Sequence, residues 1–195
     1  MTIPAAPAVR DWPLPYVARL ESRAVGAIDL VVVHCTELPD LATARTHGER
    51  ILYPASGTGN SGHWYIDRDG TTFRFVEPVR IAHHVHGCNA RSVGIELVNR
   101  GRWPDWNDSR RQEFTEPYAP AQVDALIALL DALRTSLPGL RWIAAHEDLD
   151  RRREPASDDA SILLPRRRDP GPLFPWPEVL ARCRLPRLVP DPGAA

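Results

Sequence analysis

The sequence predicts an α/β domain with a central mixed β-sheet flanked by helices. Three observations predict this class. Short apolar runs rich in β-branched residues, such as residues 28–33, are typical of buried strands. Residues 121–137 repeat apolar side chains at helical spacing. The pair Asp69-Gly70 joins two strand-like runs, which indicates a hairpin and therefore a sheet that is not purely parallel.

The first part of the chain is rich in proline and has little periodicity. We expect residues 1–27 to form an irregular N-terminal arm, with a short helix near residues 16–23. A strand over residues 28–33 follows, and residues 40–50 are expected to form a helix. Residues 55–62 are rich in Gly, Ser and Asn, which indicates a loop.

The middle of the chain alternates strands with one long helix. The hairpin strands are expected at residues 63–67 and 71–76, and a further strand at residues 92–98. The helix over residues 121–137 is the clearest element, since proline suits its first turn and a Pro-Gly pair ends it. Residues 141–145 then form the next predicted strand.

The last part of the chain is mostly polar or rich in proline. Residues 147–168 are expected to form an irregular loop, and residues 176–183 a short helix. Residues 185–195 carry Pro and Gly, which favours a loosely attached tail. We see no internal repeat and no linker, so the sequence predicts one domain over residues 28–184 between the arm and the tail.

Composition narrows the classes of function. The chain has 195 residues, 24 basic and 25 acidic, so its net charge is −1. Nucleic-acid binders usually carry a basic excess, so we expect no nucleic-acid partner. No run of about 18 apolar residues occurs, so we expect no membrane partner. All 24 basic residues are arginines, which excludes any mechanism that needs a lysine amine.

The N-terminal residues lack the basic and apolar regions of a secretory signal peptide. The three cysteines, Cys35, Cys88 and Cys183, are an odd and sparse set that does not indicate a disulfide framework. A reducing compartment is the simpler interpretation, so we expect a cytoplasmic protein.

Two histidines stand where predicted strands end. His34 and His146 would lie a few ångströms apart if their strands end at the same edge of the sheet. Asp169, followed by Pro-Gly, is a third candidate because this turn would hold its carboxylate rigidly. Two histidines and one carboxylate with an open fourth position form the usual catalytic zinc arrangement. Taken singly, each histidine could be structural and the Asp-Pro-Gly segment a simple turn.

Glu96 lies in the middle of the apolar strand expected over residues 92–98, on the same face as Gly94. A carboxylate there is costly unless it is paired or used in chemistry, and Gly94 leaves room for a ligand. Beside a metal, Glu96 would suit the role of general base. The alternative is a salt bridge to one of the many arginines.

A cluster of histidines precedes this strand at His83, His84 and His86. A second metal site is a weak alternative, and contact of His84 with a substrate is favoured. His63 could be a neighbour of the site or a core histidine. No motif of a serine or cysteine hydrolase accompanies these residues.

Six segments in a fixed order carry a family resemblance. They are Val-Val-Val-His34-Cys-Thr, Ser61-Gly-His-Trp-Tyr-Ile-Asp-Arg-Asp-Gly70, His84-Val-His-Gly-Cys-Asn89, Ser92-Val-Gly-Ile-Glu-Leu-Val98, Ala145-His146-Glu-Asp and Arg168-Asp169-Pro-Gly-Pro. Over roughly residues 28–176 the chain resembles the type-2 N-acetylmuramoyl-L-alanine amidases, the zinc family that includes AmpD, phage lysozyme-type amidases and peptidoglycan recognition proteins.

The resemblance implies the amidase type-2 fold and cleavage of the amide between the muramic acid lactyl group and L-alanine of the stem peptide. It implies Zn²⁺ as cofactor, with His34, His146 and Asp169 as ligands. The third ligand of this family is Asp or Cys, and here it is Asp. The resemblance also gives Glu96 the catalytic role, as in the AmpD-like branch.

Two departures from the family pattern matter. Phage-type members place a catalytic Tyr just before the His of the second segment, whereas this chain has Gly62, so Glu96 gains weight. AmpD-like members commonly have Lys two residues before the Asp ligand, whereas this chain has Arg167. Since arginine keeps its proton at neutral pH, we expect Arg167 to stabilise an oxyanion rather than to transfer a proton.

The implied partners are peptidoglycan fragments, with His84, Asn89 and His63 expected to contact them. We expect a monomer in which residues 147–168 lie over or beside the cleft, where their arginines meet the acidic stem peptide. Near-neutral charge and the lack of a separate wall-binding domain favour recycling of soluble (anhydro)muropeptides. Two alternatives stay open, namely a phage or prophage lysis amidase on intact wall and a non-catalytic peptidoglycan-binding module.

Overall fold

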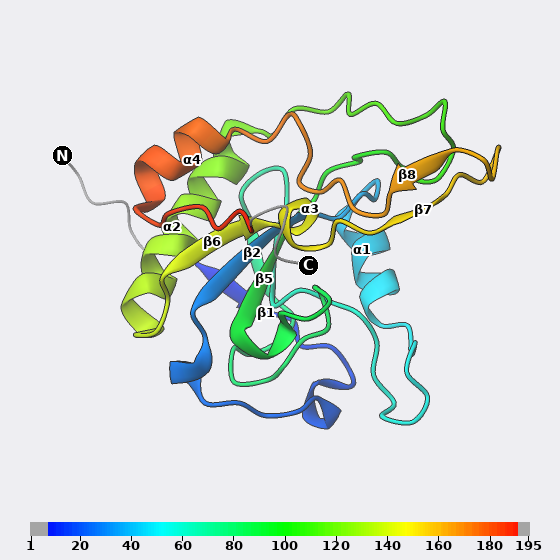
Figure 1. Ribbon diagram of the computed structural model, residues 1–195. Helices are drawn as coiled ribbons and strands as arrows, with labels where there is room; N and C mark the ends of the chain where they lie inside the picture. The colour runs from blue at the N-terminus through cyan, green and yellow to red at the C-terminus, as the bar shows by residue number, and fades with distance from the viewer. Residues whose placement is uncertain (1–7, 191–195) are drawn as a thin grey trace.

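The computed structural model describes residues 8–190, which form a central sheet with helices on both faces (Figure 1). The six strands of the sheet are β1 (Val9–Asp11), β2 (Leu30–Cys35), β3 (Trp64–Ile66), β4 (Thr72–Arg74), β5 (Ser92–Leu97) and β6 (Trp142–Ala145). The helices are α1 (Leu41–Gly48), α2 (Pro120–Ser136), α3 (His146–Leu149) and α4 (Trp176–Cys183). The α/β class with a mixed, helix-flanked sheet is therefore confirmed.

The strand order of the sheet is β1-β4-β3-β5-β2-β6. β2 pairs in parallel with both β5 and β6, and β5 pairs in parallel with β3. β3 and β4 form the expected antiparallel hairpin. The parallel strands β3, β5, β2 and β6 therefore end at one edge of the sheet, which is where ligands bind in open α/β sheets.

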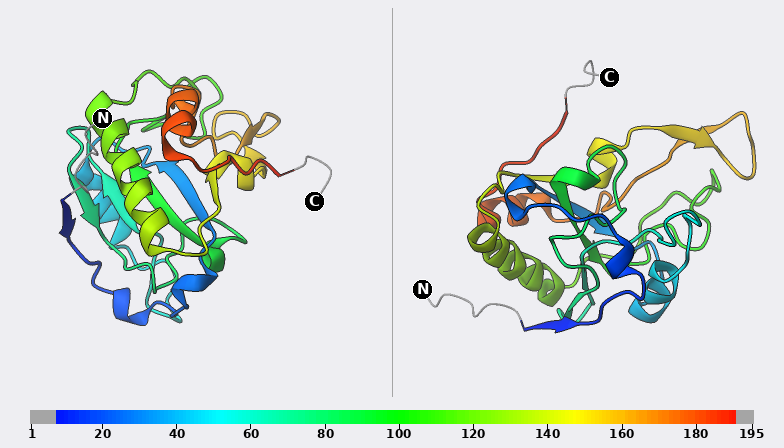
Figure 2. Two further views of the ribbon diagram at one scale, coloured as in Figure 1. Left: turned by 90° about the vertical axis from the view of Figure 1, so that its left-hand side faces the viewer. Right: turned by 90° about the horizontal axis from the view of Figure 1, so that it is seen from below.

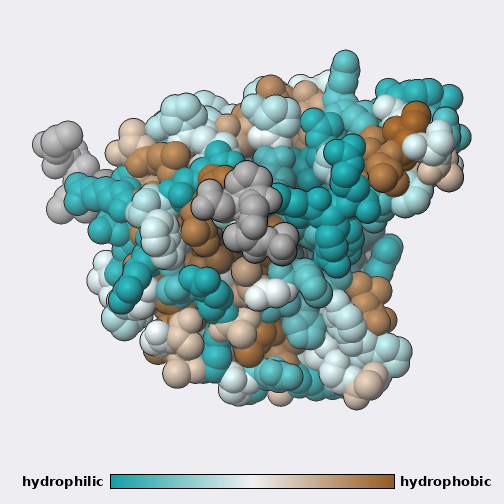
Figure 3. Space-filling model, viewed as in Figure 1, coloured by the Kyte–Doolittle hydropathy of each residue, from teal (hydrophilic) through white to brown (hydrophobic). Residues whose placement is uncertain are grey.

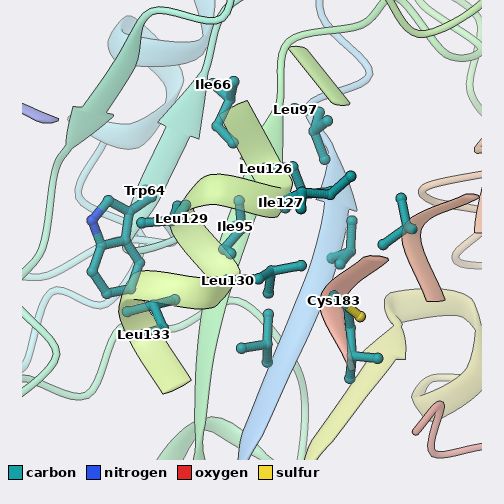
Figure 4. Close-up of a cluster of buried hydrophobic side chains, with 14 of the residues drawn as sticks. Trp64, Ile66, Ile95, Leu97, Leu126, Ile127, Leu129, Leu130, Leu133 and Cys183 are labelled. Carbon is teal, nitrogen blue, oxygen red and sulfur yellow. The ribbon is translucent and has the colours of Figure 1, made fainter. Parts of the chain in front are cut away.

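One face of the sheet is closed by α2 and α4 (Figure 2). Pro120 opens α2 at its first turn, and apolar residues at helical spacing then face the sheet. The side chains of α2 interlock with those of β3 and β5 (Figure 4). The fully or nearly fully buried residues of this contact include Ile66, Ile95, Leu97, Leu126, Ile127, Leu130 and Leu133.

The other face carries α1 and the N-terminal segment. The carboxylate of Asp40 caps α1 by accepting a hydrogen bond from the N–H of Thr43 at 2.7 Å. A second apolar cluster on this side joins Leu14, Tyr16 and Ala44 to Phe75. This cluster has fewer residues than the core under α2.

The expectation of an irregular arm over residues 1–27 is wrong for the part that the structure describes. Residues 9–11 are the edge strand β1, which pairs in parallel with β4. Leu14, Tyr16 and Leu20 are buried in the second cluster. The helix expected near residues 16–23 is only a 3₁₀ turn at Val17–Arg19. Backbone hydrogen bonds to β4 and a few isolated buried side chains hold this segment in place. Neither kind of contact produces a periodic pattern in the sequence.

The expectation of a loose tail is wrong for residues 185–188. Leu185 is buried, the N–H of Leu188 donates to the carbonyl of Ile143, and Arg187 pairs with Asp148. The tail thus extends the sheet beside β6. Residues 191–195 lie outside the described residues, and the division of the chain at residues 28 and 184 stays a prediction.

The expectation of an irregular loop over residues 147–168 also needs correction. The segment contains α3 and a small antiparallel hairpin of β7 (Arg153–Pro155) and β8 (Leu163–Pro165). The strands are short and mostly exposed, so they carry no apolar alternation that the sequence could reveal.

Among residues 8–190, none of the helices combines the length and apolar character needed to cross a membrane.

Candidate metal centre and active site

Three predicted ligands meet at the carboxyl edge of the sheet. His34 lies near the end of β2, and His146 is the first residue after β6. In the parallel pair β2–β6, Val33 stands opposite Ala145, so both chains reach the edge together. Asp169 arrives from the segment after β8, and all three residues are buried. The structure thus brings together what the sequence proposed as a ligand set.

The three ligand atoms are close enough to share one ion. His34 Nδ1 lies 3.0 Å from His146 Nδ1 and 3.0 Å from Asp169 Oδ2, and His146 Nδ1 lies 3.1 Å from that oxygen. Zinc bonds of about 2.0–2.1 Å in a tetrahedron place ligand atoms about 3.3 Å apart. Two imidazoles and a carboxylate are also a donor set that zinc accepts, so the residues fit the metal that the sequence implied.

The surroundings keep these groups in the forms that bind a cation. Burial, with the nearby His146, lowers the pKa of His34 to about 4, so the ring is neutral at neutral pH. The two histidines hold the pKa of Asp169 well below its usual range against the opposing effect of burial. A neutral imidazole and an ionised carboxylate are the ligating states of both groups.

Neighbouring residues fix the turn that carries Asp169. The Tyr118 hydroxyl donates to the carbonyl of Pro170 at 2.7 Å, and the N–H of Glu147 donates to the carbonyl of Asp169 at 3.1 Å. Tyr118 is buried and comes just before α2. Its role was missing from the sequence analysis, because no motif links it to a turn far along the chain.

Glu96 stands in the same row of the sheet as His34. The register pairs Glu96 with His34 on one side and with Tyr65 on the other. A Cβ atom on Gly62 would lie 2.7 Å from Glu96 Cγ. Glu96 therefore packs against the backbone of Gly62, where a larger side chain would force Glu96 to move.

Burial and the charge of Asp169 raise the pKa of Glu96 to about 8, while Arg167 opposes this shift. A group that titrates near neutral pH can both accept and return a proton. Glu96 thus shares the cleft with the three ligands, and its role as a general base stays a prediction.

Arg167 differs from its two neighbours in the run Arg166–Arg168. Arg166 pairs with Asp150, and Arg168 donates to the carbonyl of Gln112. Within residues 8–190, the buried Nε of Arg167 has no hydrogen-bond partner, and the side chain lines the cleft. Among the three arginines of this run, Arg167 is thus the one with an unpaired buried nitrogen, and its role as an oxyanion donor stays a prediction.

A cleft of about 590 Å³ runs across these residues. Its lining includes Tyr53, His83, Trp106, Arg152 and Arg166. The segment 147–168 thus lies beside the cleft, as expected. Hydrophilic side chains dominate the surface around the hairpin β7–β8, while an apolar patch that includes the exposed Ile162 and Leu163 lies on the hairpin itself (Figure 3).

Comparison with known proteins agrees with this geometry. The family model described as N-acetylmuramoyl-L-alanine amidase matches residues 24–172, which is most of the chain. The chain belongs to this amidase family.

Relatives within and around the family differ in size and setting. The amidase AmiD of Escherichia coli (strain K12) is 36% identical over 92 residues, which is 47% of this chain and 27% of AmiD. The endolysin of Klebsiella phage KP32 is 30% identical over 118 residues, 60% of this chain and 74% of the endolysin. A solved complex of E. coli AmiD with anhydro-N-acetylmuramic acid-L-Ala-D-gamma-Glu-L-Lys superposes with a TM-score of 0.61 at 24% identity, covering 87% of this chain and 62% of that one. The chain thus spans only about a quarter of the length of AmiD in the sequence match.

Of the residues expected to contact substrate in this amidase family member, His63 is placed elsewhere. Its ring is fully buried, its Nδ1 accepts from the N–H of Gly94, and its Nε2 faces the carbonyl of Arg80. The expectation of substrate contact is therefore wrong for His63, which is a core histidine.

Asn89 and the histidine cluster lie at the cleft with different tasks. Asn89 Oδ1 accepts from the N–H groups of His84 and Val85, so it shapes the turn before β5. The weak alternative of a second metal site at His83, His84 and His86 does not form among residues 8–190, where only the His34 group has ligand geometry.

Tyr65 is a residue that the sequence analysis missed. It is buried at the cleft beside Glu96, and its hydroxyl lies 3.2 Å from Ser61 Oγ and 3.3 Å from the N–H of Gly62. Alternation along β3 places Tyr65 on the face of His63, which is the one sequence signal that could have found it.

Proposed function

We propose that this protein is a zinc-dependent amidase that hydrolyses the amide between the lactyl group of N-acetylmuramic acid and L-alanine of peptidoglycan stem peptides. The observation that carries the proposal is the convergence of His34, His146 and Asp169 beside Glu96 in one cleft. Membership of the amidase family and the muropeptide named in the AmiD complex support this choice of substrate.

Each residue has a task in this reaction. Zinc held by His34, His146 and Asp169 would supply Lewis-acid polarisation of the scissile carbonyl. Glu96 accepts a proton from the attacking water and returns it to the leaving alanine amine. Arg167 stabilises the negative charge that develops on the carbonyl oxygen, because its guanidinium keeps its charge and faces the cleft.

The deciding experiment compares two substrates. Purified protein is incubated with soluble anhydromuropeptides and with intact sacculi, and the products are identified by mass spectrometry. Release of free stem peptides beginning with L-alanine supports the proposal. Zinc content is measured on the same sample, and Glu96→Gln serves as the matched control. Zinc-loaded protein that leaves both substrates uncut would contradict the proposed activity and favour a peptidoglycan-binding role.

The biological setting is a finer part of the proposal. We favour cytoplasmic recycling of soluble muropeptides by a monomer, and the completeness of the site within one chain supports the monomer. The similarity to the phage KP32 endolysin supports a second candidate, namely lysis of intact wall. Faster cleavage of sacculi than of soluble fragments would select the lytic role, and the reverse preference would select recycling.

A further inference from the structure

A chain of hydrogen-bonded side chains leads away from His34 on the side opposite the ligand group, through the half-buried His84 to the buried Ser92. His34 Nδ1 faces His146 and Asp169, while His34 Nε2 lies 3.0 Å from His84 Nδ1. His84 Nε2 in turn lies 3.3 Å from Ser92 Oγ, whose hydroxyl donates to the carbonyl of Cys88 at 2.8 Å. His84 therefore touches the back of a ligand rather than only the open cleft.

The end of this chain determines where each proton sits. A carbonyl oxygen only accepts, so the Ser92 hydroxyl proton points to Cys88. Ser92 Oγ then accepts the proton of His84 Nε2, because a neutral imidazole carries one N–H. His84 Nδ1 is left as an acceptor, and it takes the proton of His34 Nε2. The Nδ1 lone pair of His34 consequently points to His146 and Asp169.

Packing holds the ring of His84 in this place. A Cβ atom on Gly94 would lie 2.7 Å from His84 Nδ1, so only glycine leaves room for the ring. The ring meets those of His34 and His63 edge to face, with centroids 5.1 and 5.5 Å apart. Burial also lowers the pKa of His84 well below its usual range. The space expected beside Gly94 for a ligand is thus filled by His84.

The two histidines of the ligand group are not supported equally. His34 has the partner chain through His84, whereas His146 Nε2 has no hydrogen-bond partner among residues 8–190. A hydrogen bond to the distal nitrogen of a ligating histidine fixes its tautomer and raises its basicity. The His34 ligand alone receives this support from the described side chains.

We propose that His84 is a positioning residue, which accepts a hydrogen bond from His34 Nε2 and thereby holds His34 Nδ1 ready for the metal. This role replaces the substrate contact expected from the sequence. It rests on the zinc site of the proposed function but not on the identity of the substrate.

The test uses variants of His84 with a neighbouring control. His84→Phe keeps a ring and removes the acceptor, whereas His84→Asn places an amide oxygen near the position of Nδ1. His86→Phe is the matched control, since His86 is an exposed histidine of the same segment that also lines the cleft. Zinc affinity is measured by competition with a chelator, so no peptidoglycan substrate is required.

We expect His84→Phe to bind zinc about 10- to 100-fold more weakly, the range typical for loss of such an outer partner. His84→Asn and His86→Phe should stay within about threefold of the wild type. In kinetics, His84→Phe at subsaturating zinc should lose kcat while KM changes little. ¹⁵N NMR of the metal-free wild type should show the His34 proton on Nε2, whether or not the protein proves to be an amidase.

Ser92→Ala provides a second route if His84→Phe does not fold. Without the hydroxyl, the His84 proton can move to Nδ1, so His34 loses its acceptor and zinc affinity should fall in the same direction. Wild-type zinc affinity in folded His84→Phe, or a wild-type His34 proton on Nδ1, would overturn the proposal. A raised KM with unchanged zinc affinity in His84→Phe would instead support the substrate contact expected from the sequence. Absence of amidase activity alone would count only against the proposed function.

Discussion

The two faces of the central strands use the same backbone for different purposes. On one face, Val33 of β2 and Ile95 of β5 pack under α2 in a continuous apolar core. On the other, the next residues along the same strands are His34 and Glu96, which stand in one row at the cleft. The comparison teaches that alternation along a buried strand lets adjacent residues serve stability and chemistry separately.

A third region is the hairpin β7–β8, which forms a wall of the cleft and belongs to a separate two-stranded sheet. It is held by ion pairs and loop contacts, such as those of Asp150 with Arg152 and Arg166. If this division is correct, substitutions should separate into those that change metal and rate, those that change stability, and those that change the wall alone.

The largest effect is expected on the cleft face. His34→Ala removes one of three ligands, so bound zinc and turnover should both fall below detection. The measurements are metal analysis by mass spectrometry and product release from muropeptides. One equivalent of zinc and full activity in His34→Ala would show that the metal lies elsewhere.

Glu96→Gln should reduce kcat by about 100- to 10,000-fold, because the amide cannot take a proton from water. Zinc content and the thermal unfolding midpoint should stay close to those of the wild type. Steady-state kinetics and metal analysis on the same preparation check this. A rate near that of the wild type would show that another residue of the cleft is the base, with His84 the next candidate.

On the helix face, Leu130→Ala should lower the free energy of unfolding by about 2–5 kcal/mol through lost burial and a cavity. Leu130 is fully buried against the sheet. Zinc affinity and kcat of the folded fraction should not change. Denaturant unfolding measures the free energy of unfolding, and chelator competition measures zinc affinity. A loss of zinc affinity in Leu130→Ala would contradict the idea that the helix face serves stability alone.

Arg167→Ala should lower kcat by about 100- to 1,000-fold, the range for losing one oxyanion donor. Arg167→Lys should keep substantial activity, because the ammonium also carries a positive charge. The alkaline limb of the pH–rate profile should not report Arg167 in the wild type, whereas the lysine of the second variant can titrate. An unchanged rate in Arg167→Ala would mean that this side chain takes no part in the reaction.

The smallest effect concerns the wall. The hydrogen bonds from Arg152 and Arg166 hold the pKa of Asp150 below its usual range. A depressed folded-state pKa contributes stability above the unfolded pKa of about 3.9, and this contribution is lost as the pH falls. Asp150→Asn should therefore lower the free energy of unfolding by about 1–3 kcal/mol at pH 7 and by less at pH 3. A difference that does not depend on pH would contradict the ionic contribution.

Much of the architecture follows from sequence periodicity. The apolar runs at β2 and β5, the helical repeat of α2 and the Asp-Gly hairpin each had the expected form. These elements obey local rules, since a period of two or of 3.6 residues already shows which side chains must leave water. The edge strand β1, the hairpin β7–β8 and the segment 185–188 carry no such period, because backbone hydrogen bonds and ion pairs hold them.

By itself the sequence determined the chemical inventory, namely two strand-end histidines, a rigid Asp169 turn and a carboxylate within an apolar strand. Only the tertiary structure decided which neighbours act on that inventory. It placed His63 in the core, turned His84 to the back of His34, and left Arg167 as the unpaired member of its run within residues 8–190. The physical reason is that hydrogen-bond direction and burial depend on partners far apart in the chain, and residue type and spacing do not specify them.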